Sequence, residues 1–164
     1  MATHELEITT MAHGGSGIGR LDGRVVFTPG VIPGEVVEVE IVEDSKKSLW
    51  RAQPVKIVAP SPHRIPHIWP EADLSRPWAM RAGGADYGHI TPAAQLRYKS
   101  QILAESMQKF AKVTTSDDLV KPIGEHDRGW RTRVDLHVGE NGIPGPYAER
   151  TKNVIGVDSL PLAT

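Results

Sequence analysis

The sequence predicts a mainly β fold with an α+β second unit, in which a small β-barrel is followed by a small mixed domain. Roughly four or five short β-like segments, separated by glycine-rich turns, fill residues 5–60, which is typical of a small closed barrel. A helical pattern begins at residue 91, and further β-like segments follow it. The 164 residues are enough for one medium domain or two small ones.

Composition narrows the classes of possible function. The formal net charge is −1, so any surface that binds nucleic acid must be a local patch. The absence of cysteine excludes disulfides, thiolate zinc sites, cysteine-ligated iron–sulfur clusters and a cysteine nucleophile within these residues. No segment is long and apolar enough to cross a bilayer, and the start shows no secretory signal pattern, so we expect a cytoplasmic protein without membrane contact.

The expected barrel strands follow one another closely. Apolar and polar residues alternate over 6–10 and over 34–44, as they do in half-buried strands. Residues 25–27 are a β-branched and aromatic run. Asp22-Gly23 directly before them predicts a hairpin turn, because Gly accepts the positive φ that a tight turn needs. Residues 49–58 are the last expected strand of the barrel.

A connector and a helix come next. Prolines interrupt residues 59–90, and Trp69 and Trp78 among them indicate an ordered connector, since two tryptophans seldom stay fully exposed. Thr91-Pro92 predicts the start of a helix, with Thr as N-cap and Pro at the first helical position, and the helix is expected to end near Val113. Its expected apolar face consists of Leu96, Leu103, Met107 and Phe110.

The last part of the chain is expected to be a β meander. Residues 131–138, 142–148 and 153–157 have strand-like composition, and Asn141-Gly142 predicts the hairpin turn between the first two. No internal repeat is visible.

The glycines at 15, 17 and 19 have the spacing of a dinucleotide or S-adenosylmethionine loop. Such a loop lies between a strand and a helix, whose N-terminus binds the ligand. Here a hairpin follows the glycines, so we expect a barrel turn instead. Its small side chains would also let a phosphate or base approach the backbone N–H groups, with His13, Arg20 and Arg24 nearby as donors.

His63 and His67 have the spacing of a helical metal site. Pro62 and Pro66 exclude a regular helix there, and two histidines without a third ligand seldom form a closed site. We therefore expect no metal site.

Three runs of the barrel region form one long pattern: Gly14-Gly15-x-Gly17-x-Gly19-Arg20, Asp22-Gly23-Arg24-Val25-Val26-Phe27 and Pro29-Gly30-x-x-Pro33-Gly34-Glu35-x-Val37. This pattern resembles a TRAM domain, a small OB-like barrel found in RNA-modifying proteins. The resemblance implies an RNA ligand for the barrel.

Further runs extend over nearly the whole chain: Gly83-Gly84-Ala85-x-x-Gly88-His89, Gln95-Leu96-x-x-Lys99, Gly129-Trp130-Arg131-x-Arg133-Val134, Tyr147-x-x-Arg150-Thr151-x-x-Val154-Ile155-x-Val157 and Pro161-Leu162. They resemble the region that follows TRAM in the RNA uridine C5-methyltransferases, including its Cys-rich loop and central domain. The resemblance implies that the chain grips structured RNA and presents a uridine for methylation.

The chain departs from that family in two ways. Ala85 and Leu160 stand where two cysteine ligands of an iron–sulfur cluster would fall, which indicates a cluster-free branch with Trp69, Trp78 and apolar packing as the substitute. The family's catalytic domain would begin after Leu162. The S-adenosylmethionine site, the cysteine nucleophile and the proton-abstracting base all belong to that domain. We therefore expect no catalytic residue and no cofactor site in this chain.

Basic residues fall into two groups, one on the barrel around Trp50 and one in the second domain around Arg128. From the residues alone, each group is more readily a solvated β surface, whereas the resemblance favours RNA. Trp50, flanked by charge, is the better stacking candidate, and Phe27 is expected in the core. The expected RNA contacts are His13, Arg20, Arg24, Lys46, Lys47, Trp50, Arg51, Arg131, Arg133, Arg150 and Lys152.

The expected organisation is a TRAM/OB-like barrel over residues 4–60, a connector over 61–83 and an α+β central domain over 84–164, which stops before a catalytic domain. The expected partner is structured RNA, either rRNA or tRNA, and no DNA is expected. S-adenosylmethionine is implied only for the catalytic domain. The alternative is a stand-alone RNA-binding or protein-docking module without catalysis.

Overall fold

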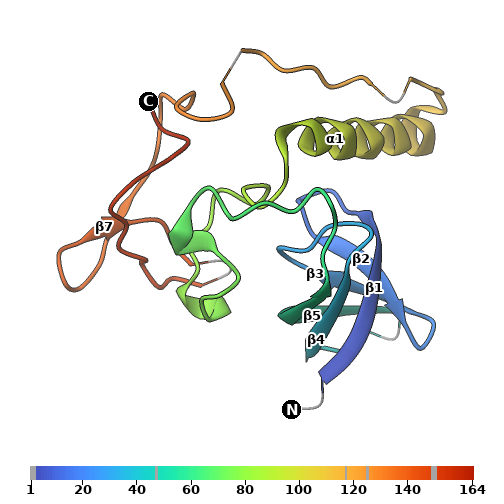
Figure 1. Ribbon diagram of the computed structural model, residues 1–164, viewed down its shortest axis with the longest axis horizontal. Coiled ribbons are helices and arrows are strands. Elements are labelled where there is room, and N and C mark those ends of the chain that lie inside the picture. The colour runs from blue at the N-terminus through green and yellow to red at the C-terminus, as the bar shows by residue number, and fades with distance from the viewer. Residues whose placement is uncertain (1–2, 47, 117, 125, 149–150) are drawn as a thin grey trace. The chain divides into compact units, whose positions relative to one another are not determined.

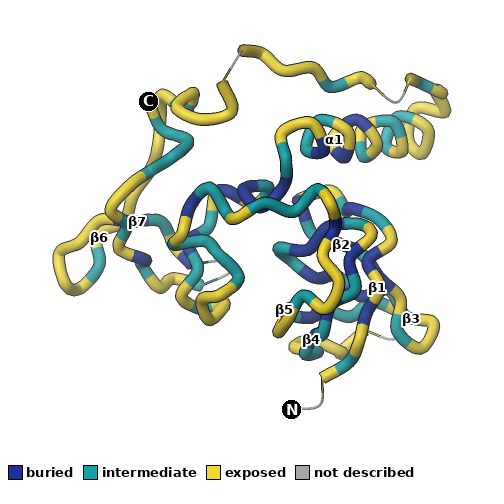
Figure 2. The backbone as a smooth tube through the Cα atoms, viewed as in Figure 1, coloured by how far each residue is buried: buried dark blue, intermediate teal, exposed yellow. Residues whose placement is uncertain are grey.

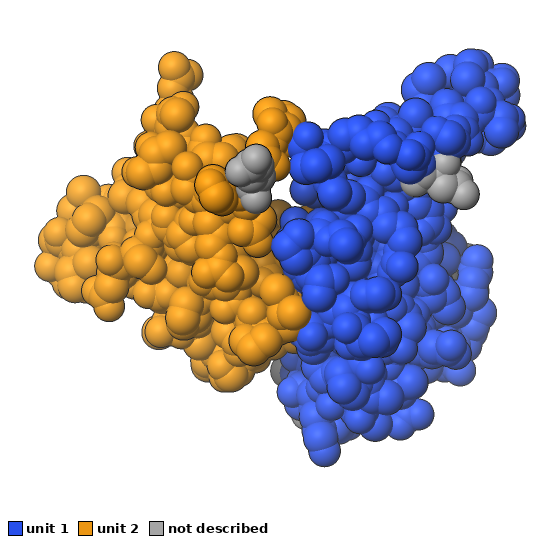
Figure 3. Space-filling view, turned by 45° about the horizontal axis from the view of Figure 1, so that its top comes forward, with its two compact units in different colours: residues 1–64, 90–122 blue, residues 65–89, 123–164 orange. Residues whose placement is uncertain are grey.

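The computed structural model describes residues 3–46, 48–116, 118–124, 126–148 and 151–164. The chain forms two compact units, each built from two stretches of sequence. The first unit comprises residues 1–64 and 90–122, and the second comprises residues 65–89 and 123–164 (Figure 3). The expected boundaries at residues 60 and 83 stay a prediction.

The first unit contains a closed five-stranded barrel in the order β1-β2-β3-β5-β4 (Figure 1). All neighbouring strands are antiparallel except β3 and β5, which are parallel. The mainly β barrel that the sequence predicts is therefore confirmed. Its strands are β1 (Thr3–Met11), β2 (Gly17–Leu21), β3 (Arg24–Thr28), β4 (Val36–Glu43) and β5 (Leu49–Ala59).

The barrel core is aliphatic and comes from alternate positions of the strands. Leu6 and Ile8 of β1 and Val37 and Val39 of β4 are each at most 1% exposed, as alternation along a half-buried strand requires (Figure 2). Between them lie exposed residues such as Glu7 of β1. This alternation fixes the register, because a slip of one residue would turn these apolar side chains to solvent.

The glycine-rich segment is a hairpin, as expected. Asp22 and Gly23 both have positive φ, at 50° and 77°, and they join β2 directly to β3. Gly17 and Gly19 are buried in β2, where no side chain has room. A Cβ on Gly17 would lie 2.6 Å from Val31 Cγ2, and one on Gly19 would lie 2.7 Å from Leu6 Cδ1.

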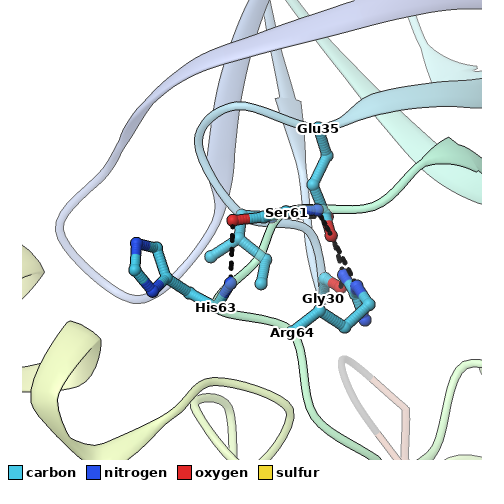
Figure 4. Close-up of polar contacts among 6 residues, drawn as sticks. Gly30, Glu35, Ser61, His63 and Arg64 are labelled. Atoms are coloured by element: carbon cyan, nitrogen blue, oxygen red, sulfur yellow. Dashed lines mark hydrogen bonds and ion pairs between the residues drawn. The ribbon is translucent and has the colours of Figure 1, made fainter.

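The chain leaves the barrel through a buried ion pair (Figure 4). Glu35 is completely buried, and the Arg64 guanidinium donates to both its carboxylate oxygens, at 2.5 and 2.7 Å. The backbone N–H groups of Ile32 and Ser61 donate to the same two oxygens, at 2.9 and 3.2 Å. Arg64 Nη2 also donates to the Gly30 carbonyl at 2.9 Å.

The helix of the first unit begins where the sequence predicts. It is α1 (Pro92–Ser106), and a single π-helical segment, η3 (Met107–Ala111), continues it to Lys112, whose φ of 58° ends it. The expected apolar face is wrong, because Leu103 is 41% and Phe110 78% exposed.

The helix buries another face instead. Its buried residues are Ala94, Tyr98 and Ser100, and Ser100 Oγ accepts the Val120 N–H at 2.9 Å. This bond ties Val120 to the helix at Ser100, a polar position that the apolar periodicity of the helix does not mark.

The second unit is mostly irregular. It contains the 3₁₀ turns η1 (Pro70–Ala72) and η2 (Trp78–Met80) and the two-residue strands β6 (His137–Val138) and β7 (Pro144–Gly145). The expected meander is therefore wrong except at β6 and β7. Among the described residues, its other segments contribute three single bridges: Tyr147 to Val154, Ala82 to Ala148 and Arg131 to Ala163.

Prolines explain part of that difference, because Pro144 and Pro146 have no N–H to donate to a ladder. The Asn141-Gly142 turn is confirmed, with the Gly142 N–H donating to the Gly139 carbonyl at 2.9 Å. The unit's core consists of Trp69, Ala82, Ala85, Ala148 and Ile155, with Leu160 and Leu162 packed against it. Trp78 is 45% exposed and contributes less than expected.

We predict that Arg64→Met lowers the free energy of unfolding by about 3–5 kcal/mol, because it leaves the Glu35 carboxylate buried without its counter-charge. Urea unfolding followed by tryptophan fluorescence measures the effect. Arg51→Met is the matched control. It removes an exposed pair with Glu43, 3.2 Å away, and should cost less than about 1 kcal/mol. Equal losses in the two variants would contradict the assigned role of Glu35.

We also predict that Gly19→Ala lowers the free energy of unfolding by about 1–3 kcal/mol, since the added methyl group overlaps Leu6 and the Glu7 carbonyl. Thermal unfolding compares it with Gly124→Ala, where nothing lies within 4 Å of the new Cβ. A melting temperature for Gly19→Ala as high as that of the control would rule out the tight β1–β2 packing.

Candidate nucleic-acid interface

Successive side chains of a strand alternate between the inside and the outside of the barrel, and this alternation places a row of side chains on the outside. Gly17 and Gly19 are buried in β2, so Ile18 and Arg20 face outward. In β3, Val26 and Thr28 are 0% exposed, which leaves Phe27 on the outer side.

The register joins these positions across three strands. Ile18 pairs with Phe27, and Phe27 pairs with Arg51 of β5. In the next row Arg20 pairs with Val25, which pairs with Leu49. Directly paired residues lie on the same side of a sheet. The outer β2-β3-β5 face therefore carries a half-buried aromatic ring between aliphatic neighbours and two arginines.

Phe27, expected in the core, thus lies on the outer face. Trp50 has the opposite parity, because it pairs with the fully buried Val26 and packs against the barrel core. The Arg24 guanidinium lies 4.4 Å from the centroid of the Trp50 ring and covers it. Trp50 thus contributes to barrel packing, and its contact with RNA stays a prediction.

Two other barrel residues expected to contact RNA, Lys46 and His13, lie near opposite ends of β2. Lys46 is exposed in the β4–β5 loop, where the Ser48 carbonyl accepts the Val25 N–H at 3.2 Å, so this loop adjoins the start of β3 and its Arg24. His13 is exposed in the β1–β2 turn, at the opposite end of β2. Lys47 lies outside the described residues.

The basic residues of the second unit fall in two places. Arg131 and Arg133 line one hollow together with Trp69, and the Arg131 guanidinium lies 5.0 Å from the centroid of the Trp130 ring. Lys152 lines another hollow beside His137 and Tyr147, whose rings stack at 3.7 Å. Arg128 is exposed, and Arg150 lies outside the described residues.

The glycine-rich segment does not fit S-adenosylmethionine or a dinucleotide. Gly17 and Gly19 face the filled barrel interior, and β2 is followed by β3, so no helix N-terminus stands after the glycines.

His67 has a structural environment. Its Nδ1 accepts the Trp69 N–H at 3.0 Å, and burial lowers the pKa of its imidazole. Burial raises the pKa of the neighbouring Asp86 carboxyl, which the charges of His67 and Arg131 partly offset. In the described part of the chain, no three His, Cys, Asp or Glu residues gather to hold a metal ion. No helix there is long and apolar enough to span a membrane.

Comparison with known families identifies the barrel. A family model described as the TRAM domain matches residues 2–55. This first part of the chain is a TRAM domain. The match covers all of β1 to β4 and most of β5, so Phe27, Arg20 and Arg51 lie within the TRAM domain.

The whole chain is similar to larger RNA methyltransferases. It is 32% identical to an uncharacterized RNA methyltransferase of Bifidobacterium longum, over 100% of this chain and 39% of the relative. A Corynebacterium glutamicum relative of the same description is 38% identical over 85% of this chain and 32% of its own length. The 23S rRNA (uracil(1939)-C(5))-methyltransferase RlmD of Shewanella amazonensis is 34% identical over 94% of this chain and 34% of the enzyme. The chain thus spans about a third of these relatives.

Proposed function

We propose that this chain is the RNA-binding and substrate-positioning portion of an S-adenosylmethionine-dependent RNA uridine C5-methyltransferase that acts on rRNA or tRNA in the cytoplasm. The observation that carries the proposal is the similarity to the Shewanella rRNA uracil methyltransferase over 94% of the chain. The TRAM domain supports it independently, because such barrels occur in RNA-modifying proteins.

The chain's own part in such a reaction is positioning. Arginines on the β2-β3-β5 face would neutralise phosphates, and the Phe27 ring would stack on an exposed base. Neither contact changes a covalent bond. Methyl transfer, with S-adenosylmethionine as donor, belongs to a part of the enzyme outside these residues.

The residues that we propose for RNA contact would bind different parts of the RNA. Arg20 and Arg51 flank an aromatic ring on one face, so the three side chains can hold one nucleotide together. Arg24 is engaged over Trp50, and His13 lies at the other end of β2. These two residues, with Lys46, would contact phosphates flanking that nucleotide.

We predict that structured RNA binds this chain with an affinity that falls steeply as salt rises, because phosphate contacts release counterions. Fluorescence anisotropy with a labelled rRNA hairpin at several salt concentrations gives the slope. Arg20→Gln should reduce the slope by about one counterion per removed contact. Arg76→Gln, at an exposed arginine outside both basic groups, is the matched control. Undetectable or salt-independent binding would contradict RNA recognition and favour a docking module.

We predict that Phe27→Leu weakens RNA binding by about 1–3 kcal/mol, whereas Phe27→Trp retains it, because only the second keeps an aromatic face. Both variants keep an apolar side chain on the β2-β3-β5 face, so thermal unfolding should show an intact barrel. Trp50→Ala should instead lower stability, since Trp50 packs against the core. Unchanged RNA affinity in Phe27→Leu would overturn the stacking role.

A further inference from the structure

A hollow in the second unit has the size of a small-ligand site. Its volume is about 310 Å³, at the lower end of the range of small-molecule pockets. The lining residues that matter below are Trp69, Gly84, Arg131, Arg133, Leu160 and Leu162. Every lining residue belongs to the second unit, so the hollow is a property of that unit alone.

Backbone pairing holds one wall of this hollow in place. The Arg131 N–H donates to the Leu162 carbonyl at 2.7 Å, and the Thr164 N–H donates to the Arg131 carbonyl at 3.1 Å. The adjacent Trp130 N–H also reaches the Leu162 carbonyl, at 3.1 Å. These bonds fix the arginine's backbone beside the apolar residues 160–163.

Gly83 and Gly84 line the hollow beside the Arg131 side chain. Gly84 has a φ of 104°, and a Cβ built there would lie 4.0 Å from an Arg131 guanidinium nitrogen. The Gly83 N–H donates to the Tyr147 carbonyl at 3.2 Å. The absence of side chains at 83 and 84 therefore leaves backbone and guanidinium accessible to a ligand in the hollow.

The lining combines a flat apolar part with cationic donors. Leu136, Leu160 and Leu162 supply apolar surface, while Arg131 and Arg133 outnumber the single acid, Asp135. A purely apolar ligand would leave the two guanidinium groups unused, and a small inorganic anion would leave the leucines uncovered. An aromatic ring that carries a phosphate matches both parts.

One buried donor in the lining lacks a partner. Trp69 is 5% exposed, and its indole Nε1 has no hydrogen-bond partner among the described residues. A buried donor without an acceptor is destabilising, so a ligand carbonyl that accepts this N–H would bind more tightly than a ligand without one. Nucleobases carry such carbonyl groups.

We propose that this hollow binds one unstacked nucleotide of the RNA, with the base against Trp69 and the leucines and the phosphate at Arg131 and Arg133. The inference rests on the proposed RNA-binding function and extends it to a second contact point outside the barrel. Single-stranded nucleotides that splay out of a fold are the form in which proteins usually read RNA bases.

The test is a titration of the full chain with uridine 5′-monophosphate, followed by the indole N–H resonance of Trp69 in ¹H–¹⁵N spectra and assigned with Trp69→Phe. We expect a saturable shift of that resonance, and weaker binding of uridine or inorganic phosphate alone. Arg133→Gln should weaken nucleotide binding by about tenfold through the lost charge-assisted bond. Arg76→Gln, at an exposed arginine of the same unit that does not line the hollow, should not weaken it.

Val134→Phe provides a second variant. Val134 lines the hollow and is 40% exposed, and the phenyl ring introduced there would fill the hollow. It should abolish the shift, whereas Val113→Phe, at 45% exposure in the first unit, should not. No saturable shift, or the same shift with phosphate alone, overturns the nucleotide site. Salt-dependent binding of the rRNA hairpin measured in parallel separates this failure from failure of the proposed function.

Discussion

The buried Glu35 carboxylate is the contact on which the first unit most depends. It lies in the loop between β3 and β4, is 0% exposed, and accepts four hydrogen bonds from Ile32, Ser61 and Arg64. Three of these bonds come from Ser61 and Arg64, which follow β5. One side chain therefore joins the loop before β4 to the segment in which the chain leaves the barrel.

That junction also organises the return of the chain. Arg64 forms a bridge with Ile90, and the Thr91 N–H donates to the His63 carbonyl at 2.9 Å. The residue that neutralises Glu35 is thus the one beside which the chain re-enters the first unit and begins α1. A buried charge with a bidentate partner is strongly destabilised when that partner is removed, which makes the junction specific as well as stable.

The sequence was informative where local chemistry decides the structure. Asp22-Gly23 and the alternation around Val37 specified a hairpin and a strand, because turn geometry and strand parity are local properties. Parity could also have placed Phe27 correctly. Glycines at 17 and 19 have no room for a side chain, so Ile18, Arg20 and the paired Phe27 must face outward. The charged residues around Trp50 suggested instead that Trp50 is the exposed aromatic ring and that Phe27 lies in the core.

Tertiary contacts decided the rest. The buried residues of α1 are Ala94, Tyr98 and Ser100, and the hydrogen bond from Val120 to Ser100 is a tertiary contact that no helical periodicity indicates. The described part of the second unit has no extended sheet, in part because prolines interrupt its strands. Its core forms instead around Trp69, three alanines and Ile155. The Glu35–Arg64 pair joins positions 29 residues apart, and a sequence pattern gives no signal for such a pair.

We propose that RNA lies against the outer β2-β3-β5 face of the TRAM domain. Ultraviolet cross-linking of the bound rRNA hairpin, followed by mass spectrometry of the peptides, tests this placement because it reports zero-distance contacts. We expect a cross-link at Phe27, with further adducts in the neighbouring segments of β2 and β5. Cross-links confined to residues outside these three strands, in RNA that is bound, would contradict it.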